Sequence, residues 1–170
     1  MKIPKHVQAM RSHLDLSIHS PAPSDAVAIV DAGLDAHNIA WAPLGDVVAL
    51  HVIAQDSGGT VIGGAIGRTW GECCELQQLW VSAELRSTGI GTQLMDAFEQ
   101  NARSRGCRLA YLDTFSFQAP SFYQTRGYVE VLRTEGFTGG VIKLTMHKRL
   151  DGVALRSASE LIDRGVSGRQ

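Results

Sequence analysis

The stretch Leu79-Trp80-Val81, followed by Arg86-Ser87-Thr88-Gly89-Ile90-Gly91-Thr92, decides how this 170-residue chain is interpreted. A short apolar strand runs into a glycine-bearing turn, and residues 90–102 continue with apolar side chains at helical spacing. The first amides of a helix have no acceptor within the helix, and the helix dipole makes that end partly positive. The turn therefore predicts an anion site, although an ordinary capped loop explains the same short pattern equally well.

The side chains of the turn suit a diphosphate. Gly89 and Gly91 would let the backbone approach it closely. The guanidinium of Arg86 and the hydroxyl of Thr88 or Thr92 could add further phosphate contacts.

Two better-known phosphate loops do not fit this turn. A Walker A loop ends in Gly-Lys-Ser/Thr, whereas Gly91 is followed by Thr92. The nicotinamide dinucleotide pattern is closer, because Asp113 lies about 20 residues on, as a ribose-binding acid should. Its third small residue would fall at Leu94, however, which is too bulky for close packing of helix on strand. The sequence therefore argues against a nicotinamide cofactor.

Hydrophobic periodicity outward from the turn predicts alternating strands and helices. The expected strands are residues 13–19, 47–54, 60–68, 73–81, 108–114, 128–132 and 141–147, and the expected helices are residues 26–38, 90–102 and 119–126. Regular alternation along 73–81 would place Glu75, Gln77, Leu79 and Val81 on one face. The second, third and fourth strands should form an antiparallel group.

Composition and charge exclude several classes of protein. The chain is 44% hydrophobic and 19% charged, which suits one globular domain. Sixteen basic and 17 acidic residues give a net charge of −1, so nucleic acid is a poor candidate partner. We find no apolar span of membrane length and no signal-peptide core, and three cysteines favour a cytoplasmic location. The six histidines lack metal-ligand spacing, so no metal is expected.

A second informative stretch is Ala119-Pro120-Ser121-Phe122-Tyr123-Gln124-Thr125-Arg126-Gly127-Tyr128. Pro120 and Gly127 bracket a short helix. Phe122 and Tyr123 are adjacent, so their side chains diverge by about 100° and cannot share one face. Without other information, Tyr123 would be interpreted as a core residue.

The two stretches together resemble the GNAT acetyltransferase superfamily. Arg86-Ser87-Thr88-Gly89-Ile90-Gly91 matches its phosphate motif, and Ala119 to Tyr128 matches its later Ala-x-x-Phe-Tyr-x-x-x-Gly-Phe/Tyr motif at every specified position. The resemblance is strong over residues 73–131 and includes the segment 112–119, which is similar to that of small stand-alone bacterial members.

The resemblance implies acetyl-CoA as co-substrate, with its diphosphate on the turn and its pantetheine arm beside Leu79 to Val81 in the manner of an added strand. Tyr123 would then protonate the departing thiolate. The residues implied in binding acetyl-CoA are Leu79, Trp80, Val81, Arg86, Ser87, Thr88, Gly89, Ile90, Gly91, Thr92, Ser116 and Phe122.

The chain departs from the family at the position of the usual general base. Many members carry a glutamate four residues before the equivalent of Val81, where this sequence has Gln77, which cannot accept a proton. Glu75 is the alternative and could act through water, or it could be a solvated carboxylate. Ser116 likewise replaces an asparagine that often contacts the pantetheine.

We therefore expect an α/β domain over residues 1–150, with a mixed sheet of six or seven strands and helices on both faces, and a short helical or frayed tail over 151–170. The expected function is acetyl-CoA-dependent acetylation of a primary amine of a small molecule. A catalytically silent acyl-CoA-binding module, an acetyltransferase of protein or peptide amines and another kind of nucleotide-binding domain stay open as alternatives. Edge strands and the tail favour a homodimer.

Overall fold

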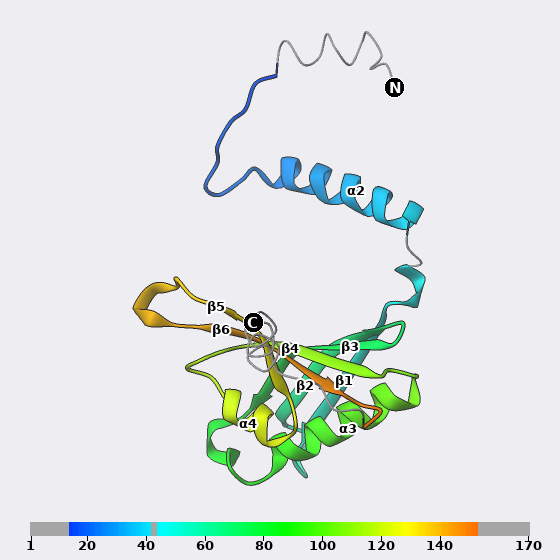
Figure 1. Cartoon of the computed structure of the whole chain (residues 1–170), viewed down its shortest axis with the longest axis vertical. Coiled ribbons are helices and arrows are strands. Elements are labelled where there is room, and N and C mark those ends of the chain that lie inside the picture. The colour runs from blue at the N-terminus through cyan, green and yellow to red at the C-terminus, as the bar shows by residue number, and fades with distance from the viewer. Residues whose placement is uncertain (1–13, 42–43, 153–170) are drawn as a thin grey trace, which may run out of the picture. The chain divides into compact units, whose positions relative to one another are not determined.

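A computed structural model describes residues 14–41 and 44–152 (Figure 1). The chain divides into two compact units, residues 1–43 and 44–170. The first contains helix α2 (Ser24–Trp41), which covers and extends the helix expected over 26–38. The prediction of a strand over 13–19 is wrong for residues 14–19, which have no regular secondary structure. Alternation alone does not make a strand stable, because a strand needs a neighbour to pair with.

The second unit contains a six-stranded mixed sheet, as expected for an α/β protein. Its elements in chain order are η1 (Leu44–Asp46), β1 (Val48–Gln55), β2 (Val61–Trp70), β3 (Cys73–Val81), η2 (Ala83–Leu85), α3 (Ile90–Ser104), β4 (Leu109–Phe115), α4 (Pro120–Thr125), β5 (Val129–Thr134), η3 (Thr138–Gly140) and β6 (Lys143–Arg149). The strand order is β1-β2-β3-β4-β6-β5. Only β3 and β4 pair in parallel, and the long crossover between them contains α3.

Helix α3 forms the core against one face of this sheet. Its inward stripe is fully buried at Met95, Phe98 and Ala102, and it packs on strand residues such as Cys74 and Leu112. Gly106 follows the helix with φ of 85°, in the left-handed region that commonly ends helices. The helix expected over 90–102 is therefore confirmed.

Helix α4 lies on the same side of the sheet as α3 (Figure 1). The guanidinium of Arg126, directly after α4, contacts the carboxylates of Asp96 and Glu99 on α3 at 2.6 and 3.4 Å. The sequence also predicts helices on the opposite face of the sheet. That stays a prediction, because α2 belongs to the other unit and is not placed relative to the sheet. The tail expected over 151–170 lies outside the described residues from 153 onward.

A β-bulge interrupts β3, so the regular alternation predicted along this strand does not hold. In the pairing with β2, Gly67 lies opposite Leu76 and Ile66 lies opposite Gln78, so Gln77 is an extra residue. Leu76 is buried before the bulge, and Leu79 and Val81 pack on the core after it. The single face expected for residues 75, 77, 79 and 81 is therefore wrong, because the extra residue switches which side chains point inward.

Candidate active site

A cleft opens where β3 and β4 separate. Their parallel pairing runs from Cys73 beside Leu109 to Leu76 beside Leu112 and then stops. The cleft has a volume of about 820 Å³, and its lining includes the end of β3, Arg86 and Tyr123. Residues Leu79 and Val81 pair with β2 on one side only, so their other backbone edge is available to an extended ligand. We call this space the strand cleft.

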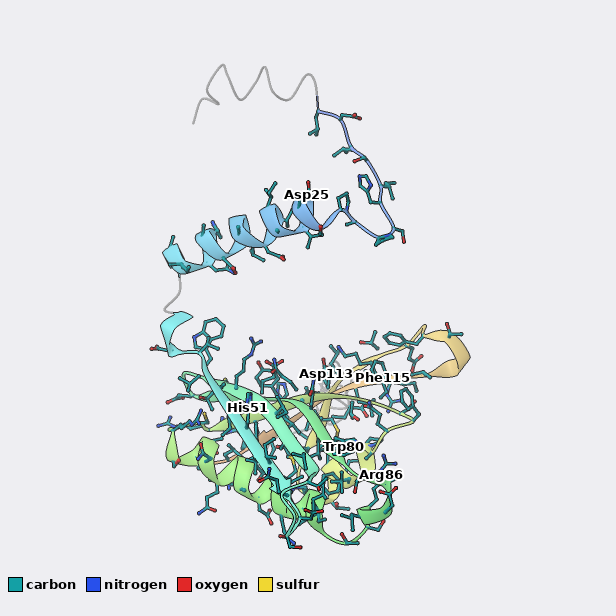
Figure 2. All side chains as sticks on the ribbon, turned by 180° about the vertical axis from the view of Figure 1, so that it is seen from behind. Asp25, His51, Trp80, Arg86, Asp113 and Phe115 are labelled. Atoms are coloured by element: carbon teal, nitrogen blue, oxygen red, sulfur yellow. The ribbon has the colours of Figure 1, made fainter. Side chains whose placement is uncertain are left out.

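The turn predicted to bind a diphosphate follows β3 directly. Figure 2 labels Trp80 near the end of β3 and Arg86 beyond it. No hydrogen bond within the described chain uses the amide hydrogens of residues 87–92, and no side chain caps α3. Ser87 and Gly89 adopt left-handed φ values of 63° and 95°. Successive amides in such a turn form a concave site for an anion.

Two side chains of this turn are already engaged with backbone oxygens. The Thr88 hydroxyl donates to the Leu85 carbonyl at 2.7 Å, and the Arg86 Nε donates to the Val81 carbonyl at 3.2 Å. These bonds hold the turn against the end of β3. The terminal nitrogens of Arg86 make no hydrogen bond within the described residues, so they are available to a ligand.

Tyr123 lies on α4 and lines the strand cleft. Its side chain is buried, with the residue 8% exposed, and its ring packs edge-on against Phe122 and Tyr128. Burial raises the pKa of the Tyr123 phenol above 10.0. A phenol in this environment keeps its proton at neutral pH and can donate it.

The two residues that the sequence offered near the position of the general base lie side by side. Gln77 lines the strand cleft, and its Nε2 donates to Glu75 Oε2 at 3.3 Å. The same carboxylate oxygen accepts from Arg68 Nε at 2.6 Å. Glu75 does not line the strand cleft itself, so a proton would reach it through water.

Phe122 and Ser116, like residues 87–92 of the turn, do not line the strand cleft. The Phe122 ring lies close to Gly91: a Cβ atom built at Gly91 would be 3.7 Å from the ring, which is van der Waals contact. The ring therefore supports the start of α3. The Ser116 hydroxyl accepts from the Ile142 amide at 3.1 Å, and the Ser116 amide donates to the Ile142 carbonyl at 2.8 Å. Ser116 therefore joins the segment after β4 to the approach to β6.

Sequence reasoning missed Gln118, which shapes the far wall of the strand cleft. Gln118 Oε1 accepts hydrogen bonds from the Thr114 hydroxyl at 3.1 Å and the Phe115 amide at 2.9 Å. This fixes the turn between β4 and α4, and thus the position from which Tyr123 enters the cleft. Only the glutamine's place between a strand and a proline-opened helix could have indicated such a role.

Neither a metal site nor a membrane span is found in the part of the chain that the structure describes. No group of three or more His, Cys, Asp or Glu side chains there could hold a metal ion. Likewise, over residues 14–41 and 44–152 no helix has both the length and the apolar character needed to cross a membrane.

Comparison with known proteins identifies the family. The model described as the acetyltransferase (GNAT) family matches residues 21–128, and the chain belongs to this family. Its fold and the catalytic class of its relatives make it an acetyltransferase, as the sequence motifs predicted.

Individual relatives agree with this assignment. The chain is 32% identical over 93 residues to blasticidin-S acetyltransferase of Streptomyces morookaense, covering 54% of this chain and 68% of that one. It is 30% identical over 110 residues to an acetyltransferase of Agrobacterium fabrum, covering 65% and 80%. A crystal structure of an acetyltransferase from Bacillus cereus superposes with a TM-score of 0.68 and 27% identity, covering 79% of this chain and 97% of that chain.

Proposed function

We propose that this protein transfers the acetyl group of acetyl-CoA to a primary amine of a small molecule by direct attack on the thioester. The observation that carries the proposal is the row of amides at residues 87–92 that make no hydrogen bond within the described part of the chain, beside a cleft that Tyr123 also lines. The relative named blasticidin-S acetyltransferase supports a small-molecule acceptor.

The amine must first lose a proton. An alkylamine has a pKa near ~10.4 and is mostly protonated at neutral pH, and only the neutral amine attacks a thioester. Gln77 cannot accept the proton, but its contact with Glu75 provides a route through water to a carboxylate. In this proposal Glu75 receives the proton and Gln77 orients the water.

The neutral amine then forms the nitrogen–carbon bond, the attacking nitrogen releases its second proton to solvent water, and the carbon–sulfur bond breaks. A backbone amide on the unpaired edge of Leu79 to Val81 would stabilise the oxygen that gains negative charge. The departing thiolate has a conjugate-acid pKa of about 8.5, below the pKa of the buried Tyr123 phenol, so it leaves readily by itself and the phenol assists by donating a hydrogen bond to the sulfur as the bond breaks. Tyr123 keeps its proton in this scheme.

Two measurements separate this proposal from its alternatives. Acetyl-CoA should bind saturably, and a panel of small amines should stimulate release of free thiol above the rate of hydrolysis. A silent acyl-CoA-binding module would bind acetyl-CoA without amine-stimulated release. Absence of acetyl-CoA binding would instead favour another nucleotide ligand and overturn the proposal.

A further inference from the structure

A second cavity of about 290 Å³ lies beside the strand cleft on the sheet. Its lining consists of Arg68, Trp70, Gly71, Cys73, Glu75 and Tyr111. Arg68 on β2, Glu75 on β3 and Tyr111 on β4 are register partners, so the three side chains form one row across the sheet. We call this space the side cavity.

The charged groups of the side cavity retain unused hydrogen-bonding capacity. Arg68 and Glu75 form an ion pair through Nε and Oε2, at 2.6 Å. The terminal nitrogens of Arg68 and the Oε1 atom of Glu75 make no hydrogen bond with any described residue. A guanidinium with two free nitrogens suits a carboxylate, and the free carboxylate oxygen suits an ammonium group. The pair can therefore receive both charges of a zwitterion.

Two aromatic rings, together with Gly71 and Cys73, form the rest of the wall. Trp70 is about half exposed at the end of β2, and Tyr111 is partly buried between the ion pair and His147. Burial, followed by the charge of Glu75, raises the pKa of the Tyr111 phenol above 10.0. Both rings thus offer uncharged surface to the body of a ligand whose charged groups contact Arg68 and Glu75.

The side cavity adjoins the strand cleft along β3. Glu75 lines the side cavity, Gln77 lines the strand cleft, and the two side chains share a hydrogen bond of 3.3 Å. Two residues of a strand span about 7 Å, which is within the length of a small molecule. A ligand in the side cavity can therefore present an amine at the boundary between the two spaces.

We propose that the side cavity binds the acceptor and that this acceptor is an amino acid, with its carboxylate on the terminal nitrogens of Arg68 and its amine between Glu75 and Gln77. This inference rests on the proposed function and assigns its substrate class. Arg68 is then a specificity residue, and the ion pair with Glu75 holds it in place.

The test compares amino acids with their carboxamides as acceptors, using amine-stimulated thiol release. The wild-type protein should have a higher kcat/KM for the carboxylate form of its preferred amino acids. Arg68→Met removes the charge but keeps an unbranched apolar stem, and it should lower kcat/KM for the carboxylate form about 10- to 100-fold. Loss of the contact with Glu75 lowers the value for both forms alike, so the readout is the ratio of the carboxylate to the carboxamide value, which should fall and which general damage to the fold would leave unchanged.

The matched control is Arg108→Met. Arg108 forms a more exposed ion pair, with Glu72 at 3.4 Å in the neighbouring turn, and it does not line the side cavity. This variant should keep the wild-type preference. An Arg68→Met variant that also keeps the preference, or a wild-type protein that acetylates both forms equally, would overturn the inference and leave the proposed function intact.

Binding provides a readout that does not depend on turnover. Amino acids should change the tryptophan fluorescence of the wild-type protein saturably, and Trp70→Phe should abolish that change. If this signal requires Arg68 while no amine stimulates thiol release, the side cavity stands and the proposed function fails. No saturable signal and no carboxylate preference would together refute the side cavity as an amino-acid site.

Discussion

At the scale of single residues, the proposed role of Tyr123 can be tested directly by one substitution. Tyr123→Phe removes one oxygen atom from a buried ring that lines the strand cleft. We expect kcat to fall by about 100-fold, since this is the lower range for loss of a general acid and thiolates leave readily. The KM for acetyl-CoA should change little, because only the phenol's assistance to the leaving group is lost.

Tyr128→Phe provides the matched control for this variant. The Tyr128 hydroxyl is buried without a hydrogen-bond partner in the described chain, and it does not line the strand cleft. Its removal should leave kcat unchanged. Steady-state kinetics on both variants decide the matter, and equal effects would reassign Tyr123 to packing.

Position 67 must be glycine, because the backbone of β3 lies very close to it at the bulge. A Cβ atom there would lie 2.0 Å from the Glu75 carbonyl oxygen and 2.8 Å from the edge of the Phe98 ring. Gly67→Ala must therefore move β3 or α3, and we expect it to lower the free energy of unfolding by about 3 kcal/mol or more. Urea unfolding measures this loss.

Gly45→Ala is the control, because no atom of the described residues lies within 4 Å of a Cβ at Gly45. Its effect should stay within about 0.5 kcal/mol. If Gly67→Ala were equally mild, the bulge would not hold the two strands as closely as the structure shows.

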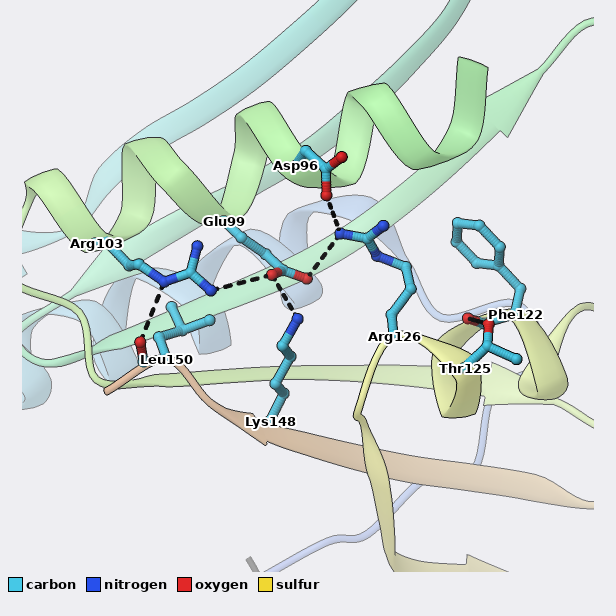
Figure 3. Close-up of polar contacts among 8 residues, drawn as sticks. All are labelled: Asp96, Glu99, Arg103, Phe122, Thr125, Arg126, Lys148 and Leu150. Atoms are coloured by element: carbon cyan, nitrogen blue, oxygen red, sulfur yellow. Dashed lines mark hydrogen bonds and ion pairs between the residues drawn. The ribbon is translucent and has the colours of Figure 1, made fainter. Parts of the chain in front are cut away.

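At the scale of secondary-structure elements, the buried carboxylate of Glu99 joins α3 to its neighbours (Figure 3). Its side chain is 3% exposed and contacts Lys148 on β6 at 2.6 Å, and Arg103 and Arg126 at 3.4 Å each. Glu99→Gln removes the negative charge that these three cations share. We expect a loss of about 3–5 kcal/mol in the free energy of unfolding, because the cations then lose their buried counter-charge.

Asp96→Asn tests the same Arg126 partner at the surface. Asp96 contacts Arg126 at 2.6 Å, but its side chain is 65% exposed. Exposed ion pairs contribute little, so the loss should stay below about 1 kcal/mol. A loss as large as that of Glu99→Gln would show that the contact distance matters more here than burial.

Most elements could be predicted from local pattern, because their residues carry their own signals. The bounds expected for the strand over 73–81 are those of β3, and the helix over 90–102 is part of α3. The failures required information from distant parts of the chain. Residues 14–19 alternate correctly without forming a strand, and the bulge at Gln77 depends on the register between two strands.

The same limit applies to the candidate site. The turn at 86–92 and the helix carrying Tyr123 were recognised because each has a compact sequence motif. Glu99 was missed because its partners Arg126 and Lys148 lie 27 and 49 residues away. The side cavity was missed for a related reason, since three strands contribute its charged and aromatic residues.

At the scale of the whole described unit, the bulge in β3 affects both the core and the candidate site. One face of the sheet packs on α3, where the bulge at Gln77 leaves Leu79 and Val81 turned toward the core. The same bulge lies at the point where β3 leaves β4, so it opens the strand cleft and separates it from the side cavity. One extra residue thus sets both the packing of β3 and the layout of the site.

The packed core also predicts how the stability of the whole unit depends on pH. Burial, followed by the charge of Cys107, raises the pKa of the Cys74 thiol from 9.0 to about 12. Above pH 9 the unfolded chain releases this proton while the folded chain retains it, so the unfolded state binds fewer protons. The free energy of unfolding should therefore be independent of this group below pH 9 and fall as the pH rises from 9 to about 12.

Urea unfolding at a series of alkaline pH values measures the slope, and two core variants assign it. Cys74→Ala should make the decline less steep, because it removes a proton that only the folded chain holds, while the raised pKa values of Tyr111 and Tyr123 maintain the remaining slope. Leu76→Ala removes packing two residues further along β3, also on the buried side, and should lower stability equally at every pH with the slope intact. An unchanged slope in Cys74→Ala would mean that this thiol ionises in the folded chain as readily as in the unfolded one, which its complete burial in the core argues against.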